Sequence, residues 1–321
     1  MGNVDQSLLV HPPAKVNLIL KIFDRLPNGY HALWSFMQTV GVTDELTIRV
    51  TDAFEGVRLE CSDATLPVST GNLAYRAAEL VLERAGISTG VALKLVKGIP
   101  VEAGLGGGSS DAAATIMGLN RLLDLGWTNG DMAALGRILG SDVPFFMEAP
   151  TAVVHGWGQR IIPKTLDGVR WIVLVNPGFP INTAQAFRRL DEVRQTIPAL
   201  PEVLESVERA SFASWSGILA RMENDFEIAL IDDYPVLADI KRALLTMGAE
   251  GALLSGSGAT VFGVFQEQAE AIRAKGVFSE ASEYRVAAGP SLQDGLLERI
   301  SNVGAPSPDA DGKTRAKRSS C

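Results

Sequence analysis

The sequence predicts an α+β enzyme with two lobes and a ligand site in the cleft between them. Three observations support this prediction: an early block of strand-like runs, a glycine-rich loop that leads into an alanine-rich helix, and a largely helical block over residues 183–246. Separate strand and helix blocks are typical of α+β proteins, and ligands often bind between lobes. We expect lobes over residues 1–160 and 161–303. A polar tail over residues 304–321, rich in Pro, Gly and Ser, is expected to be disordered.

Hydrophobic periodicity predicts the individual elements. The expected strands are 16–23, 45–50, 57–61, 91–96, 151–154, 171–175, 253–254 and 260–265. The expected helices are 73–85, 109–125 and 131–139, with several more between 183 and 246. A second glycine-rich turn, residues 255–258, separates the last two strands.

The composition indicates an ordinary enzyme of the reducing cytoplasm. Apolar residues make up 46% of the 321 residues and charged residues 21%, as in most globular proteins. The net charge of −8 argues against general nucleic-acid binding, which needs a basic face. Two cysteines and three histidines provide neither a disulfide framework nor a structural zinc site. No apolar run approaches the ~20 residues of a membrane span. We therefore expect a cytoplasmic enzyme that acts on a small molecule, without a nucleic-acid or membrane partner; protein partners are not predicted.

Residues 100–110 are the most informative segment, because their order predicts a phosphate-binding loop. A strand ending at Val96 is followed by four glycines within five residues, two serines and an alanine-rich helix. Glycines let backbone N–H groups approach a ligand, and the following helix N-terminus favours an anion. The segment is not a Walker loop, because no lysine lies between Lys97 and Lys164. A dinucleotide fingerprint also fits poorly, because its acidic residue is badly placed. The loop alone leaves open a plain glycine-rich turn.

Two charged residues outside the loop are candidates for the chemistry. Lys15 begins an apolar strand, where its ammonium group is either an edge charge in solvent or a cation near a reacting hydroxyl. Asp142 lies in an otherwise apolar turn, where it either caps the turn or acts as general base for an alcohol. A lysine beside this carboxylate would keep it ionised.

Two further segments are weak signals by themselves. Residues 28–31 read Asn-Gly-Tyr-His, which is typical of a turn but also offers a ring and an imidazole to a base. Residues 254–260 read Leu-Ser-Gly-Ser-Gly-Ala-Thr, which forms either a second nest of backbone N–H groups or a plain turn between strands.

Together these segments resemble one family. In order, they read P-A-K-V-N-L, G-Y-H, P-V-E-A-G-L-G-G-G-S-S-D-A-A-A, G-S-D-V-P-F-F and L-S-G-S-G-A-T. This set is similar to the 4-diphosphocytidyl-2-C-methyl-D-erythritol kinases, a branch of the GHMP small-molecule kinases, from about Pro13 to Phe265. The resemblance implies a two-lobed GHMP kinase fold, with ATP and Mg²⁺ as cofactors. It also implies phosphorylation of the C2 hydroxyl of 4-diphosphocytidyl-2-C-methyl-D-erythritol in non-mevalonate isoprenoid synthesis.

The resemblance also implies roles for individual residues. Lys15 and Asp142 correspond to the catalytic pair of the family, and Asn72 and Lys97 to contacts near the adenosine. The ATP phosphate loop corresponds to Pro100, Val101, Glu102, Ala103, Gly104, Leu105, Gly106, Gly107, Gly108, Ser109 and Ser110. Ser110 is also the candidate magnesium ligand. The cytidyl substrate site corresponds to Asn17, Tyr30, His31, Thr183, Phe187, Gly256, Ser257 and Gly258, with the cytosine between the rings of Tyr30 and Phe187.

Some questions stay open. Asp111 stands where the wider superfamily usually has alanine, and no role is predicted for it. A GHMP kinase for another small alcohol, such as mevalonate, homoserine or a sugar, would share the phosphate loop. A silent ligand-binding member of the fold would be expected to lack Lys15 or Asp142, and both are present.

Overall fold

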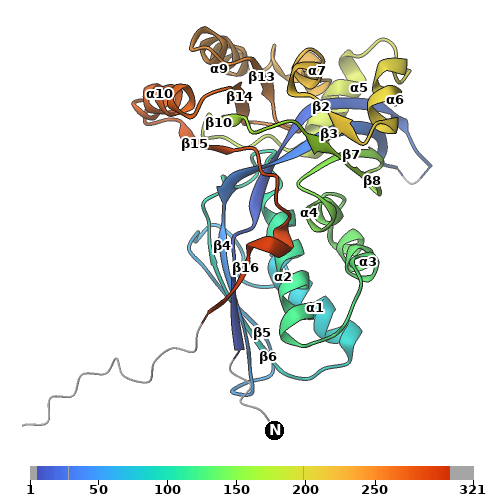
Figure 1. The fold of residues 1–321 in the computed structure, drawn as a ribbon, viewed down its shortest axis with the longest axis vertical. Helices are drawn as coiled ribbons and strands as arrows, with labels where there is room; N and C mark the ends of the chain where they lie inside the picture. The colour runs from blue at the N-terminus through green and yellow to red at the C-terminus, as the bar shows by residue number, and fades with distance from the viewer. Residues whose placement is uncertain (1–5, 28, 198, 304–321) are drawn as a thin grey trace, which may run out of the picture.

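The computed structural model describes residues 6–27, 29–197 and 199–303, and it folds into two lobes that lie one above the other (Figure 1). Two long antiparallel strands, β2 (Pro13–Arg25) and β3 (His31–Thr43), lie where the lobes meet and extend into the upper lobe of Figure 1. They carry candidate site residues at both of their ends.

The first lobe is built on a five-stranded sheet in the order β16-β1-β4-β6-β5. Its strands are β1 (Gln6–Val10), β4 (Glu45–Thr51), β5 (Gly56–Cys61), β6 (Gly90–Val96) and β16 (Ile300–Val303). All neighbours are antiparallel except β5 and β6. Because β16 pairs with β1, the last described strand belongs to the sheet of the first lobe, which a division of the chain at residue 160 does not predict.

The remaining strands form three sheets. The one at the junction has the order β12-β2-β3-β7-β8, and that of the second lobe has the order β13-β14-β10-β15; β9 and β11 form a short pair. The new strands are β7 (Thr151–Gly156), β8 (Arg160–Pro163), β9 (Thr165–Leu166), β10 (Trp171–Asn176), β11 (Phe212–Ala213), β12 (Glu223–Asn224), β13 (Gly251–Leu254), β14 (Val261–Phe265) and β15 (Arg285–Pro290).

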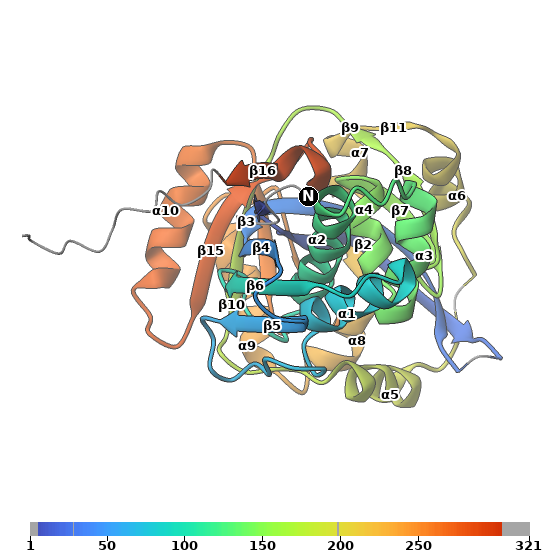
Figure 2. The same cartoon turned by 90° about the horizontal axis from the view of Figure 1, so that it is seen from below.

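The helices are divided between the lobes. Those of the first lobe, gathered on one side of its sheet (Figures 1 and 2), are α1 (Leu73–Ala85), α2 (Gly107–Leu122), α3 (Asn129–Leu139) and α4 (Val143–Glu148). The later helices are α5 (Thr183–Val193), α6 (Glu202–Arg209), α7 (Trp215–Leu219), α8 (Phe226–Leu230), α9 (Pro235–Thr246), α10 (Gln268–Ser279) and the 3₁₀ turn Leu296–Arg299. None of the described helices combines the length and apolarity that a membrane crossing requires.

Helix α2 is the central element of the first lobe. Its residues from Ser110 to Leu119 are all buried, because α2 packs against α1 and the first sheet. A row of alanines, Ala112 to Ala114, allows this close packing on several sides at little loss of side-chain entropy. The helix that follows the glycine loop is therefore held rigidly in the core, and its N-terminus is a fixed platform for a ligand.

The sequence-predicted elements are largely confirmed, with α1 and α3 close to their expected bounds. Several elements were not predicted, among them β1, β3, β15, β16, α4 and α10. Strand β3 was represented only by its first residue, His31, and α4 was expected to be a turn. Strand β3 is mostly buried and therefore lacks the alternation of a half-exposed strand, and α4 is too short for a helical period to be recognised.

Candidate active site

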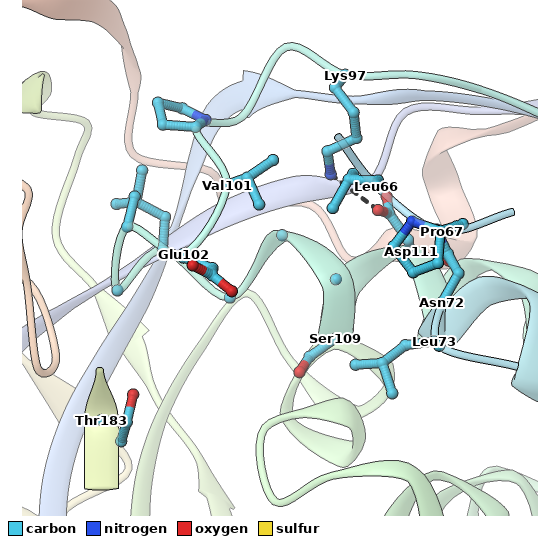
Figure 3. Close-up of a pocket in the computed structure, with 18 residues that line it drawn as sticks. Leu66, Pro67, Asn72, Leu73, Lys97, Val101, Glu102, Ser109, Asp111 and Thr183 are labelled. Atoms are coloured by element: carbon cyan, nitrogen blue, oxygen red, sulfur yellow. Dashed lines mark hydrogen bonds and ion pairs between the residues drawn. The ribbon is translucent and has the colours of Figure 1, made fainter. Parts of the chain in front are cut away.

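The glycine loop joins the end of β6 to the start of α2 and borders a cavity of about 460 Å³ (Figure 3). Gly104 and Gly106 adopt positive φ angles of 75° and 70°. Figure 3 shows Glu102 and Thr183 on one side of the cavity and Asn72 and Leu73 on the other. The lining consists of Leu66, Pro67, Gly71, Asn72, Leu73, Lys97, every residue from Pro100 to Ser109, Asp111 and Thr183.

The carbonyl groups of the loop are turned toward the protein. The oxygen of Gly104 accepts from Ser255 Oγ at 3.0 Å, and that of Leu105 accepts from the backbone N–H of Lys15 at 2.9 Å. The oxygen of Ala103 accepts a longer bond from the N–H of Thr260, at 3.4 Å. Because these oxygens are engaged, they are not presented to a ligand, so the loop favours an anion at its N–H groups.

Close packing explains why glycine is needed in the loop. A Cβ atom on Gly104 would lie 2.0 Å from the carbonyl oxygen of Ser255, and one on Gly106 would lie 3.0 Å from Lys15 Cγ. The loop is thus held between β2 and the second glycine-rich turn, residues 255–258. These contacts join the two glycine-rich segments that the sequence singled out.

Lys15 and Asp142 meet beside this loop. Lys15 Nζ lies 3.9 Å from Asp142 Oδ2, and it donates a hydrogen bond of 2.6 Å to Asn17 Oδ1. Asn17 is itself fixed, because its amide group donates to Ser35 Oγ at 2.8 Å. A Cβ on Gly256 would lie 3.3 Å from Lys15 Nζ, so the ammonium group is also close to the second glycine turn.

The two members of this pair have different environments. Lys15 is 4% exposed, and burial lowers its pKa from the ordinary value of 10.5, although the charge of Asp142 opposes this effect. The Asp142 side chain, at the start of α4, is 37% exposed and can be reached by a substrate. The accessible Asp142 carboxylate is suited to accept a proton from an alcohol. The buried Lys15 ammonium beside it is suited to stabilise the negative charge that develops on the alcohol oxygen.

The second glycine turn borders a further cavity of about 550 Å³. This cavity shares Glu102, Gly104 and Thr183 with the first one, so the two are adjoining parts of one cleft. Thr183 Oγ1 and Ser257 Oγ lie 2.9 Å apart across it. Asn224, which the sequence analysis missed, donates to the carbonyl oxygens of Leu254 and Gly256 at 2.8 Å each and so fixes the turn.

The predicted cytosine contacts are only partly brought together. The rings of His31 and Phe187 stack, with centroids 4.7 Å apart and an interplanar angle of 9°. His31 Nε2 also lies 2.9 Å from an oxygen of Asp191. Tyr30, which is 60% exposed, instead has its ring 5.9 Å from that of Trp157. The expected arrangement of Tyr30 facing Phe187 across a slot is therefore not what the described rings show.

Asn72 and Lys97 both line the first cavity, but their polar groups are engaged with the protein. Asn72 caps α1 by accepting from the N–H of Ala74 at 3.0 Å. The ammonium group of Lys97 binds the carboxylates of Asp44 and Asp111, the latter at 2.9 Å. Burial raises the pKa of Asp111 to about 8. The positive charge of Lys97 opposes this rise, and the negative charge of the Asp44 carboxylate adds to it.

The prediction that Ser110 binds magnesium stays a prediction, and the position of this residue is as follows. Ser110 is fully buried, does not line the cavity, and makes no hydrogen bond through its hydroxyl to the described protein. Ser109 and the exposed Glu102 bring a hydroxyl and a carboxylate to the cavity lining, which also includes Asp111 and Thr183. The helical turn places adjacent serines on different faces of α2, which a motif alone does not show.

Comparison with known proteins identifies the family. The models of the GHMP kinase N-terminal and C-terminal domains match residues 72–149 and 184–282. A 4-diphosphocytidyl-2-C-methyl-D-erythritol kinase from Pelobacter propionicus is 40% identical over 288 residues, which are 89% of this chain and 100% of the relative. A kinase of the same name from Geobacter metallireducens is 39% identical, with 89% and 99% covered. The chain belongs to the 4-diphosphocytidyl-2-C-methyl-D-erythritol kinase family.

Solved structures agree with this assignment. The crystal structure of a 4-(cytidine 5'-diphospho)-2C-methyl-D-erythritol kinase, 33% identical, superimposes with a TM-score of 0.71 over 88% of this chain and 98% of that one. A homoserine kinase from Cytophaga hutchinsonii, only 20% identical, gives a TM-score of 0.70 and shows the shared fold. The chain is thus an ATP-dependent kinase with the two-lobed GHMP fold, and the predictions of fold and enzyme class are confirmed.

Proposed function

We propose that this kinase transfers the γ-phosphoryl group of ATP to the C2 hydroxyl of 4-diphosphocytidyl-2-C-methyl-D-erythritol. Relatives that carry this substrate in their name match the chain along almost their whole length. The observation that carries the proposal is the Lys15–Asp142 pair, 3.9 Å apart, beside a glycine loop whose carbonyl groups are engaged elsewhere.

The loop and the start of α2 supply the binding site for the triphosphate in this proposal. N–H groups of the loop and the positive end of the α2 dipole stabilise the phosphate charge without a basic surface. This agrees with a chain whose net charge is −8. The adenosine lies toward Asn72 and Leu73, on the far side of the cavity from Thr183 (Figure 3).

The transfer itself is direct. The acceptor oxygen attacks the γ-phosphorus, its proton passes to the Asp142 carboxylate, and the bond to the β-phosphate oxygen breaks to release ADP. The Lys15 ammonium stabilises the charge that develops on the acceptor oxygen, and Asn17 keeps this ammonium in place. No phosphorylated enzyme is part of this proposal, because the Asp142 carboxylate takes the proton of the acceptor and the acceptor oxygen itself attacks the phosphorus.

In this proposal, magnesium binds together with ATP. No group of three potential metal-ligating His, Cys, Asp or Glu side chains occurs in the part of the chain that the structure describes. Two of the side-chain oxygen donors at the cavity, the Ser109 hydroxyl and the Glu102 carboxylate, fit an ion held mainly by phosphate oxygens. When bound, the ion would offset phosphate charge during the transfer.

The cytidyl end of the substrate is assigned to the region of His31, which lines a separate cavity of about 290 Å³ that shares no lining residue with the two cavities of the cleft. His31 and Phe187, whose rings stack on each other, offer an aromatic face and a ring nitrogen to the cytosine, and Tyr30 would have to leave its position beside Trp157 to cover the base. Thr183 and the turn 256–258 contact the diphosphate. Binding energy from this remote part fixes the C2 hydroxyl in line for attack. A cytoplasmic location completes the proposal, because the reaction consumes ATP.

ATP consumption with a panel of acceptors tests the proposal. With magnesium present, turnover is expected with 4-diphosphocytidyl-2-C-methyl-D-erythritol and not with mevalonate, homoserine or galactose. Turnover with another of these alcohols would overturn the cytidyl site while keeping the kinase. Nucleotide binding without any turnover would overturn the proposed reaction.

A further inference from the structure

Three buried ionisable residues meet at the base of the glycine loop. Asp44 and Asp111 are 1% and 2% exposed, and the Lys97 side chain between them is 8% exposed. Lys97 is the first residue after β6, whereas Asp111 lies one turn inside α2. The hydrogen bond between them, 2.9 Å from Lys97 Nζ to Asp111 Oδ2, therefore closes the two ends of the loop onto each other.

Asp44 extends this closure to the first residues of the loop. Its Oδ1 atom accepts from the N–H groups of Gly98 and Ile99 at 2.7 and 2.8 Å, and its Oδ2 atom accepts from Lys97. Asp44 is also anchored through its own N–H, which donates to the carbonyl oxygen of Pro12 at 3.0 Å. The entry of the loop is thus tied to the backbone that leads into β2, and its exit is tied to α2 through Asp111.

We propose that Asp111 is a positioning residue for the phosphate loop, acting through Lys97 and Asp44. We call these three residues the loop clamp. The loop clamp fixes both ends of the segment 97–106, so that its N–H groups are already arranged for a triphosphate before ATP arrives. Preorganisation of this kind raises affinity, because the loop loses little freedom on binding. The inference rests on the proposed ATP site.

Two observations link the loop clamp to the ligand and distinguish it from an ordinary buried ion pair. Lys97 and Asp111 both line the cavity that the glycine loop borders. A Cβ on Gly107, the first residue of α2, would lie 3.4 Å from Lys97 Nζ, so the ammonium group is packed against the helix N-terminus itself. Helix α2 is immobilised by the core, so the clamp transfers that rigidity to the loop.

The test compares three variants. Asp111→Ala removes one of the two carboxylate acceptors of Lys97, Asp44 being the other, whereas Asp111→Asn keeps an oxygen acceptor of the same size. Asp225→Asn is the matched control: Asp225 is 4% exposed, pairs with Lys21 at 2.8 Å, and lines neither cavity. Affinity for a non-hydrolysable ATP analogue is measured by calorimetry, and backbone exchange in segment 97–106 is measured by hydrogen–deuterium exchange without nucleotide.

The expected result is specific to the nucleotide. Asp111→Ala should weaken the affinity for the ATP analogue by about tenfold or more, because one charge-assisted hydrogen bond that orders the binding loop is lost. Exchange in segment 97–106 should become faster, and KM for ATP should rise more than kcat falls. Asp111→Asn should restore most of the affinity. Asp225→Asn should lower the melting temperature without changing analogue affinity or loop exchange.

Unchanged loop exchange and unchanged affinity in Asp111→Ala would overturn the inference, and so would a loss of affinity equal to that of Asp225→Asn. If Asp111→Ala does not fold, Asp111→Ser, whose side chain is too short for the pair, is measured in its place against the same expectations. Failure of the proposed function has a different signature. The wild-type protein would then bind the analogue but transfer nothing to the cytidyl acceptor, while loop exchange would still report on the clamp.

Discussion

Substitution of Gly104 by alanine tests how the two glycine-rich segments support each other. Gly104 has a φ of 75°, and its Cβ would lie 2.0 Å from the carbonyl oxygen of Ser255 and 3.0 Å from that of Gly258. Both obstacles are backbone atoms, so neither can rotate away as a side chain would. The loop or the turn 255–258 must move.

The expected cost has two parts. A left-handed conformation costs about 1 kcal/mol for alanine relative to glycine. Overpacking against a fixed neighbour adds about 1–3 kcal/mol. Gly104→Ala should therefore lower the free energy of unfolding by about 2–4 kcal/mol, which corresponds to a fall in melting temperature of about 3–6 °C for a chain of this size.

Gly86→Ala is the matched control. Gly86 ends α1 with a φ of 64°, and no atom lies within 4 Å of the position of its Cβ. This variant pays only the conformational cost, about 1 kcal/mol. Melting temperature is measured by circular dichroism and ATP-analogue affinity by calorimetry.

The two variants should differ in both measurements. Gly104→Ala should melt clearly below Gly86→Ala and should lose most of its ATP affinity, because the displaced loop no longer presents its N–H groups in the same arrangement. Gly86→Ala should keep wild-type affinity. Equal melting temperatures and equal affinities in the two variants would refute the packing argument.

Three further predictions concern the catalytic pair and the base site. Asp142→Asn should reduce kcat by about 10²–10⁴-fold and leave KM for ATP within about twofold, because only the proton acceptor is lost. Since burial lowers the pKa of Lys15, kcat should fall on the alkaline side below pH 10.5. Asn17→Leu, which removes an acceptor that favours the ammonium form, should move this fall to lower pH in a kcat profile. His31→Ala removes a ring that stacks on Phe187 and should raise KM for the cytidyl acceptor by about tenfold, with KM for ATP unchanged in steady-state kinetics.

Each of these three predictions would be contradicted by a specific result. An Asp142→Asn variant with near wild-type kcat would show that another group accepts the proton. A kcat profile of Asn17→Leu that coincides with the wild-type profile would show that Lys15 protonation does not limit the rate. Equal increases in both KM values for His31→Ala would indicate a general loss of structure instead of a base-binding role.

The sequence was sufficient to predict the glycine loop and many of the helices and strands. Glycines at Gly104 and Gly106 were expected from the need for close backbone approach, and both have positive φ. The predicted bounds of α1, residues 73–85, are confirmed, and the structure shows Asn72 as its N-cap and Gly86 as its left-handed C-cap. Such signals are local, which is why a single sequence carries them.

The sequence did not predict which residues from distant segments come together at the site. Asn224, Asp191 and Trp157 lie in segments without a motif, and only the folded chain brings them to the site. Ser110 and Ser109 are adjacent in the motif, yet the turn of α2 buries one and exposes the other to the cavity. Asp44 and Asp111 meet at Lys97 because β4 pairs with β6. No pattern in the loop specifies this strand pairing.

A single-turnover experiment tests the central claim most directly. Enzyme in excess is mixed with ATP labelled at the γ-phosphate, magnesium and 4-diphosphocytidyl-2-C-methyl-D-erythritol, and the labelled product is followed in the wild type and in Asp142→Asn. We predict transfer of the label to the 2-hydroxyl in the wild type, with no labelled protein at any time and at most slow transfer in Asp142→Asn. Transfer at equal rates in both proteins, or a labelled enzyme that precedes the product, would contradict direct transfer by the Lys15–Asp142 pair.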